Sequence, residues 1–248
     1  MLLTDDIELL DGLPIAHIRS INALAVADLH LGYEGVMSGG AALLPKVNLA
    51  NIIKEISAAI KMTGATAVIV DGDIKNEFSR VDREEFNELY DFIQFGRSEH
   101  VSLILIKGNH DNFVERYKEP FKLDVYRQEA NIGGYLFFHG EELPKDITKN
   151  TKMMIMGHEH PAIGIYNAVG FKEKLKCFLY GKYMSTPLLI LPAMNYFAGG
   201  TEINNEPRTS LLSPVFKKVD PDNMHAIAIG YGSTIDFGKV GKLRNVRT

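Results

Sequence analysis

Short apolar runs alternate with helical patterns in the first half of the chain. The runs at 23–27, 67–70 and 101–106 are rich in small or β-branched residues, which is typical of buried strands. The segments 49–60 and 86–93 between them carry apolar residues at helical spacing. This strand-helix-strand-helix-strand order predicts parallel pairing with right-handed crossovers.

Both helices have recognisable limits. The first should end near Thr63-Gly64, and the second should follow Ser79, which with Asp82 resembles a capping box. We expect the second helix to bury Phe86, Leu89, Tyr90 and Ile93. The glycine-rich segment 32–45 is expected to be a loop over the functional site.

The pattern changes after residue 120. Helical periodicity fades, and short strands are predicted at 135–139, 153–157, 175–180, 188–191, 225–229 and 233–237. We therefore expect a second, more antiparallel sheet packed on the first, with the functional residues along the shared rim. Because no Pro/Gly/Ser linker separates the halves, residues 1–248 are interpreted as one domain.

Five of the predicted strands end in polar side chains that can bind metal. The carboxyl ends of strands in α/β sheets are where ligands usually bind. Oxygen and nitrogen ligands without sulfur suit Mn, Fe, Zn, Ni or Co. The seven candidate ligands are Asp28, His30, Asp73, Asn109, His139, His158 and His160.

Seven ligands are too many for one tetrahedral ion, and they suit two ions that share a carboxylate. Paired ions are a standard device for in-line displacement at phosphorus. The residue pattern itself leaves open which ligand holds which ion.

Composition and charge narrow the picture only slightly. The net charge of −4 gives no global basic field for nucleic acid. Cys177 is the only cysteine, which excludes an internal disulfide and a zinc–thiolate cluster. The N-terminus lacks the positive region of a signal peptide, and no apolar run approaches the ~20 residues of a membrane span. A cytoplasmic protein with no membrane partner is expected.

The polar strand ends resemble the signature blocks of a known family. The five blocks are Asp28-x-His30, Gly72-Asp73, Gly108-Asn109-His110-Asp111, His139-Gly140 and Gly157-His158-Glu159-His160. In order and spacing they resemble those of the calcineurin-like metallophosphoesterases. The resemblance implies an α/β fold, a four-layer α-β-β-α sandwich of two mixed β-sheets flanked by helices.

The resemblance also implies roles for individual residues. Asp28, His30, Asp73 and His160 would hold one ion, and Asp73, Asn109, His139 and His158 the other, so that Asp73 bridges. His110 would be the catalytic histidine over the leaving group, oriented by Asp111.

Further runs are similar to the ICC-like phosphoesterases, which are often labelled as related to double-strand-break repair nucleases or as DNA-ligase-associated. These runs extend to Leu191-Pro192-Ala193-Met194-Asn195. Two positions depart from the family: Asn76 replaces the usual Asp, and Glu141 stands where many members have His. The branch resemblance implies two divalent ions, with Mn as the first expectation, DNA-repair partners and a homodimer.

These observations favour one functional hypothesis over two alternatives. The first is a two-metal phosphodiesterase or nuclease acting on DNA, RNA or nucleotides through a metal-bridging hydroxide, with His110 assisting the leaving group. The alternatives are a small-molecule phosphomonoesterase or cyclic nucleotide phosphodiesterase, and a catalytically weak scaffold with the same fold. Lys75 and Asn76 are candidate substrate contacts, although Lys75 could equally be a solvated loop lysine.

Overall fold

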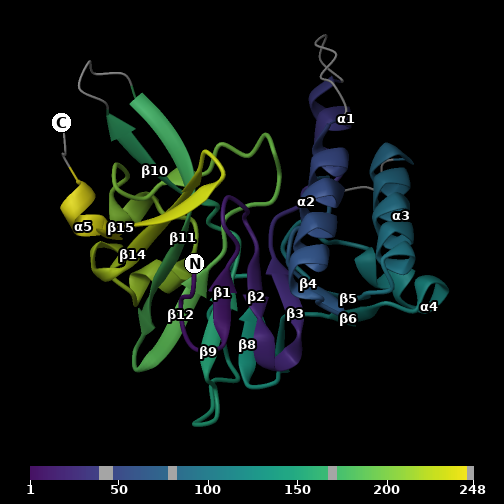
Figure 1. The fold of residues 1–248 in the computed structure, drawn as a ribbon, viewed down its shortest axis with the longest axis horizontal. Helices are drawn as coiled ribbons and strands as arrows, with labels where there is room; N and C mark the ends of the chain where they lie inside the picture. The colour runs from purple at the N-terminus through teal and green to yellow at the C-terminus, as the bar shows by residue number, and fades with distance from the viewer. Residues whose placement is uncertain (39–46, 78–82, 167–171, 245–248) are drawn as a thin grey trace.

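The computed structural model describes residues 1–38, 47–77, 83–166 and 172–244, in which two β-sheets pack against each other (Figure 1). The first sheet has six strands in the order β1-β2-β3-β4-β5-β6. Strands β3 to β6 are parallel, and β1 and β2 extend the sheet in antiparallel fashion. The predicted parallel order is thereby confirmed. The bounds are β1 Ile7–Leu9, β2 Ala16–Ile18, β3 Ala23–Val26, β4 Ala67–Asp71, β5 Ser102–Ile106 and β6 Asp124–Tyr126.

The second sheet has nine strands and is mixed. Its main path is β13-β10-β11-β12-β9-β8-β7, and β14 joins it through β11 and carries β15. Strands β8, β9 and β12 are mutually parallel, and most other pairs are antiparallel. The strands are β7 Glu129–Ile132, β8 Tyr135–Phe138, β9 Met153–Met156, β10 Pro161–Tyr166, β11 Lys172–Tyr183, β12 Thr186–Ile190, β13 Thr201–Glu202, β14 His225–Gly230 and β15 Ser233–Lys239.

All six strands predicted after residue 120 are present, and four more, β6, β7, β10 and β13, were not predicted. Strands β7 and β13 are short and partly polar, and β10 begins with Pro161 and contains Gly164. Local sequence gives little signal for such strands, because their pairing partners stabilise them.

Helices α2 (Asn48–Thr63) and α3 (Arg83–Ser98) cover the outer face of the first sheet (Figure 1). Helix α2 buries Ile52, Ile56 and Ala59 and ends at Gly64, which adopts the left-handed conformation (φ 69°) that favours glycine. The predicted end of this helix is confirmed.

The predicted buried face of α3 is partly wrong. Leu89 and Ile93 are buried, whereas Phe86 and Tyr90 are 36% and 42% exposed. The inward position one turn before Leu89 is taken by Glu85, which is 2% exposed and accepts backbone hydrogen bonds from the β4–α3 connection. The expected capping box at Ser79 and Asp82 lies outside the described residues.

The expected loop over residues 32–45 is wrong at its start. Helix α1 spans Tyr33–Ser38. The Glu34 carboxylate accepts hydrogen bonds from the backbone N–H groups of Val47 and Asn48 at 3.0 and 2.7 Å, so it ties α1 to the start of α2. Satisfying these free N–H groups stabilises a helix start.

The outer face of the second sheet is covered by short elements rather than by long helices. They include the 3₁₀ helices η4 (Pro214–Lys217) and η5 (Pro221–Asn223) and helix α5 (Val240–Leu243). Their residues Val215, Phe216 and Val240 share a buried cluster with strands of the second sheet. The predicted fold class of two mixed sheets flanked by helices is confirmed, with a thin fourth layer. Four further short elements are η1 (Arg19–Ile21), η2 (Val114–Tyr117), α4 (Lys118–Phe121) and η3 (Arg208–Ser210).

The two sheets share an apolar core. Ile7 and Ile69 of the first sheet lie in one cluster with Phe178 and Leu189 of the second. Burial of apolar area at ~25 cal/mol per Å² makes such a cluster a main source of stability. The cluster supports our interpretation of the chain as one domain. Among the described residues, no helix combines the length and the apolar character needed to cross a lipid bilayer.

Candidate metal centre

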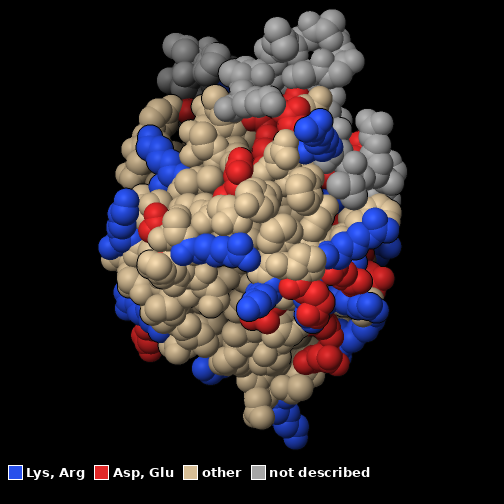
Figure 2. Space-filling view, turned by 90° about the vertical axis from the view of Figure 1, so that its right-hand side faces the viewer, with Lys and Arg blue, Asp and Glu red and all other residues tan. Residues whose placement is uncertain are grey.

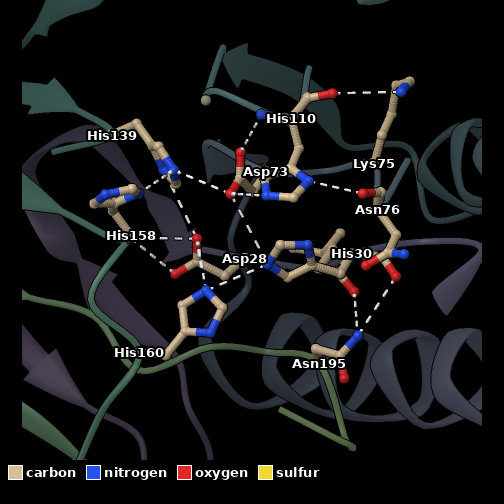
Figure 3. Close-up of polar contacts among 12 residues, drawn as sticks. Asp28, His30, Asp73, Lys75, Asn76, His110, His139, His158, His160 and Asn195 are labelled. Carbon is tan, nitrogen blue, oxygen red and sulfur yellow. Dashed lines mark hydrogen bonds and ion pairs between the residues drawn. The ribbon is translucent and has the colours of Figure 1, made fainter. Parts of the chain in front are cut away.

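Six of the predicted ligands converge in two groups on the rim shared by the sheets (Figure 3). Within each group the potential ligand atoms lie within 4.8 Å of one another. They follow β3, β4, β8 and β9, all of which run parallel to a neighbour within their sheets. The first group is Asp28, His30 and His160, and the second is Asp73, His139 and His158.

Within each group, the imidazole nitrogens and carboxylate oxygens of different residues lie close to one another. In the first group, His160 Nε2 lies 3.3 Å from His30 Nε2 and 3.4 Å from Asp28 Oδ1. In the second, His139 Nε2 lies 3.2 Å from both Asp73 Oδ2 and His158 Nδ1. Imidazole nitrogens that point at each other have unfavourable geometry unless a proton or a cation lies between them.

Asp73 lies between the two groups. Its Oδ2 atom is 3.2 Å from His139 Nε2 of its own group and 3.9 Å from His30 Nε2 of the other. Its Oδ1 atom accepts the backbone N–H of His110 at 2.9 Å, which holds the carboxylate in place. This placement is what a bridging carboxylate requires.

Asn109 follows β5 on the same rim. Its Oδ1 atom is buried and has no hydrogen-bond partner among the described residues. A buried amide oxygen without a partner costs about 1–3 kcal/mol. Such an oxygen is a suitable ligand for a hard cation, and it supports Asn109 as the seventh ligand.

Five of the candidate ligands have a left-handed backbone. Their φ angles lie between 45° and 67°. For residues other than glycine this conformation costs roughly 1–2 kcal/mol each, and such strain concentrates at functional sites. The five residues are Asp28, His30, Asp73, His158 and His160.

Glycines allow the ligand loops to approach one another closely. A Cβ on Gly108 would lie 2.2 Å from Asp73 Oδ1, and one on Gly72 would lie 1.9 Å from His139 Nδ1. A Cβ on Gly157 would lie 2.7 Å from Ala27 Cβ. These separations are far below van der Waals contact, so the three glycines are needed for the ligands to converge.

The pKa shifts keep nitrogen and oxygen donors available for a cation. Burial lowers the pKa of His30 to about 4, and burial together with the charge of His139 lowers that of His158 to about 4, so both imidazoles are neutral at pH 7. Burial alone would raise the pKa of Asp73, but the imidazoles of His139 and His30 outweigh it and lower the pKa.

The pKa values of the other two histidines, His139 and His160, are shifted in the opposite direction. Burial opposes protonation of His139 and His160, but Asp73 and Asp28 respectively outweigh burial and raise each pKa. A metal ion would bind these imidazoles in their deprotonated form and would displace a proton held there. The residues present therefore fit two divalent cations in position, donor chemistry and charge.

His110 lies beside the two groups with its ring partly exposed. Its Nδ1 atom is 2.7 Å from the carbonyl oxygen of Asn76, so Nδ1 carries the proton that is donated to this oxygen. Its Nε2 atom lies on the side of Asp73, 3.9 Å from Oδ2 (Figure 3). Nε2 is thus the nitrogen that can act on a bound substrate.

The structure places the Asp111 carboxylate against backbone groups and not against the His110 ring. The Asp111 carboxylate accepts the backbone N–H groups of Gly108 at 2.9 Å and Lys75 at 3.1 Å. It therefore joins the loop after β5 to the loop after β4. The carbonyl of Asn76, rather than the Asp111 carboxylate, orients the imidazole. Burial raises the pKa of Asp111 to about 6, with a further contribution from the charge of Asp73.

Lys75 lies behind the site. Its side chain is 1% exposed, and its Nζ atom lies 3.2 Å from Glu85 Oε2 and donates to the carbonyl oxygens of Glu77 at 2.6 Å and His110 at 3.4 Å. The sequence suggested that Lys75 either contacts a substrate phosphate or is a solvated loop residue. The buried ammonium with several hydrogen-bond partners differs from both. Asn76 contributes its backbone carbonyl to the site. We propose that both residues position His110.

Lys75→Met should lower stability by about 3 kcal/mol, because it leaves Glu85 buried without its charged partner. Burial already raises the pKa of Glu85, so the unpaired carboxylate would be costly. Chemical denaturation measures the loss. The double variant that combines Lys75→Met with Glu85→Gln should recover part of the lost stability.

The matched control is Lys145→Met, since Lys145 pairs with Glu142 on the surface at 3.1 Å with 59% and 61% exposure. That change should alter stability by less than about 1 kcal/mol. Equal losses for Lys75→Met and Lys145→Met would contradict a structural role for Lys75.

Asn195 belongs to the surroundings of the site but was not among the predicted site residues. It is fully buried, and its Nδ2 donates to the carbonyl oxygens of Leu29 at 3.3 Å and His30 at 3.4 Å (Figure 3). Its Oδ1 accepts the N–H groups of Phe197 and Ala198. The available signal was a polar residue directly after the apolar run at 188–194.

Comparisons with known proteins give one matching family model and similar solved structures. A model of the calcineurin-like phosphoesterase family matches residues 21–182. The nuclease MPE of Pseudomonas putida has a similar structure, with a TM-score of 0.61, 18% identity and coverage of 92% of this chain and 93% of that one. YfcE, a phosphoesterase from E. coli, matches with a TM-score of 0.42, 15% identity and coverage of 86% and 96%. No curated protein has a significant sequence match.

Proposed function

Since the chain belongs to the calcineurin-like phosphoesterase family, we propose that this metal-dependent phosphoesterase hydrolyses phosphodiester bonds in nucleic acids or nucleotides at a dinuclear centre. The observation that carries the proposal is the position of Asp73 between two adjacent groups of ligands. We assign Asp28, His30 and His160 to one ion, and Asn109, His139 and His158 to the other, with Asp73 shared.

Bound divalent ions would neutralise the phosphate and activate water for attack. The remaining chemistry falls to the chain's own residues. Nδ1 of His110 is held by the Asn76 carbonyl, so a protonated Nε2 can give its proton to the departing oxygen. A positioned general acid of this kind contributes ~10²–10⁴-fold. Backbone contacts of Asp111 keep the two supporting loops together.

Two observations support a diester rather than a monoester substrate. The fold is similar to that of a nuclease over nearly the whole length of both chains, and the sequence resembles the ICC-like branch.

The face of the molecule on the side of helices α3 and α4 carries intermixed basic and acidic residues without a large patch of one sign (Figure 2). A broad duplex-binding surface on that face is therefore not part of the proposal. Mn as the metal, a cytoplasmic location, DNA-repair partners and a homodimer stay predictions.

Protein loaded with Mn should cleave bis-p-nitrophenyl phosphate and single-stranded DNA or RNA faster than p-nitrophenyl phosphate. Chelation of the metal should abolish the cleavage, and added Mn should restore it. Faster hydrolysis of the monoester would favour the phosphomonoesterase alternative, and a preference for cyclic nucleotides would favour a cyclic phosphodiesterase. Loaded protein that cleaves none of these substrates would favour the scaffold alternative.

A further inference from the structure

Three aromatic side chains lie together, and one of them, Tyr33, follows the candidate ligand His30 by three residues. The rings of Tyr33 and Phe197 are stacked, with centroids 5.8 Å apart and an interplanar angle of 10°. The ring of Tyr196 meets Phe197 edge-on at 5.5 Å, and Tyr196 is 62% exposed. We call Tyr33, Tyr196 and Phe197 the aromatic shelf.

The shelf is attached directly to the loop that carries His30. The backbone N–H of Tyr33 donates to the His30 carbonyl at 3.2 Å. Asn195 donates to the same carbonyl and accepts the N–H of Phe197. Three residues span at most ~11 Å, so Tyr33 is within that distance of His30 along the chain. Bases in a nucleic-acid strand are spaced about 3.4 Å apart, so a few nucleotides can reach from the metal groups to the shelf.

Buried polar groups hold the backbone of the segment that carries Tyr196 and Phe197. The N–H of Tyr196 donates to Asn48 Oδ1 at 2.9 Å. Lys176 Nζ donates to the carbonyl oxygens of Ala193, at 2.8 Å, and of Asn195. Because Asn48 and Asn195 are fully buried, the backbone that carries Tyr196 and Phe197 is anchored to the protein interior. Such preorganisation of the backbone lowers the entropy cost of binding.

The shelf lies apart from the apolar core that the described residues form. In the described part of the chain, its three residues belong to none of the three apolar clusters. A second aromatic group, on α3, η2 and α4, differs in this respect, because its members Tyr117 and Phe121 pack against the apolar cluster that contains Ile52 and Leu89. An aromatic group attached to a ligand loop but outside the core points to a ligand with a planar ring.

We propose that the aromatic shelf stacks a nucleobase of a single-stranded substrate whose phosphodiester lies at the metal groups. This inference rests on the proposed function and adds the residues that recognise the substrate. Stacking on aromatic side chains accepts every base, because each base has a π face. Single strands are favoured because their bases are free to stack on protein. The shelf therefore selects nucleic acid over other phosphodiesters without selecting a sequence.

The test compares binding of a normal strand and an abasic strand. Fluorescence anisotropy of Mn-loaded protein would use a phosphorothioate oligothymidylate and an abasic oligomer of equal length and charge. The native protein should bind the thymidylate ~5- to 100-fold more tightly. Tyr33→Leu and Phe197→Leu keep apolar bulk but remove the ring, so each should bring this ratio close to one. Tyr33→Phe keeps the ring and should preserve the ratio.

Tyr231→Leu is the matched control, since Tyr231 is 88% exposed and lies at the turn between β14 and β15. It should leave the ratio unchanged. Equal binding of both oligomers by the native protein would overturn the proposal, and so would leucine variants that retain the ratio. Thermal unfolding checks that each variant is folded.

A second measurement separates this proposal from the proposed function. The KM of Tyr33→Leu should rise for the p-nitrophenyl ester of thymidine 5′-monophosphate but not for methyl p-nitrophenyl phosphate, which lacks a base. Native protein that hydrolyses neither ester would refute the proposed function, while the anisotropy ratio would still decide the shelf. If the variant hydrolyses both esters with unchanged KM values, the base-stacking role of the aromatic shelf is refuted and the proposed phosphodiesterase function is not.

Discussion

Asp73→Asn should remove both metal ions from the protein at once. The Asp73 Oδ2 atom faces His139 at 3.2 Å and His30 at 3.9 Å, so one carboxylate serves both groups. Asparagine keeps the shape but supplies neither the negative charge nor a second anionic oxygen. Elemental analysis of desalted protein should fall from two ions per chain to less than one. Turnover should fall by at least ~10³-fold, since the metals stabilise the transition state by several kcal/mol.

His160→Ala is the matched control, because His160 belongs to one group only. It should keep about one ion per chain. A readout independent of turnover is the rise in melting temperature on adding Mn, since a ligand that binds only the native state stabilises it. That rise should disappear in Asp73→Asn and shrink in His160→Ala. If Asp73→Asn keeps one tightly bound ion, Asp73 is not a bridge.

His110→Ala should slow turnover by ~10²–10⁴-fold while both metal ions and the fold are retained. His110 lies outside both ligand groups, and its Nδ1 is engaged by the Asn76 carbonyl at 2.7 Å. In the proposed mechanism Nε2 is therefore the proton donor to the leaving group. The loss should be small for p-nitrophenolate, which needs little protonation, and large for the ribose oxygen of a nucleic acid. Turnover rates of the variant on both types of substrate measure this dependence on the leaving group, and elemental analysis checks that the metal ions are retained.

Asp111→Asn tests whether Asp111 supports His110 through the backbone of the two loops or through direct contact with the imidazole ring. Because Asp111 bonds to the backbone of Gly108 and Lys75 rather than to the imidazole, its replacement should lower stability without the dependence on leaving group. A weaker copy of the His110→Ala pattern would show that Asp111 acts through the ring. Loss of a metal ion from His110→Ala itself would make His110 a ligand and refute its role as an acid.

The candidate ligands that the structure brings together could be singled out from the sequence because the signal is local. Each apolar strand is short, and the polar residue that follows it is within a few positions of the strand end, as with Asp28 after β3 and His139 after β8. Parallel strands bring such ends to one rim whatever the details of the core. The same reasoning predicted α2, whose apolar face and glycine end lie within one segment.

The local sequence pattern did not predict the position of a side chain where contacts with residues distant along the chain determined it. The buried face of α3 was mispredicted because Glu85 is buried through bonds to the loop after β4. Lys75 reads as a loop residue in the sequence, yet its ammonium is enclosed by Glu85 and backbone carbonyls. The shelf likewise unites Tyr33 and Phe197, which are distant along the chain.

The sequence by itself thus determined which residues can bind metal and at which strand ends they lie. Only the tertiary structure decided how they act together. His30 and His160 are 130 positions apart, and the carbonyl that orients His110 is 34 positions before it. Geometry between such residues depends on how the two sheets pack and on glycines that let Asp73 and His139 approach. Packing of this kind is a property of the whole core, so no local stretch of sequence encodes it.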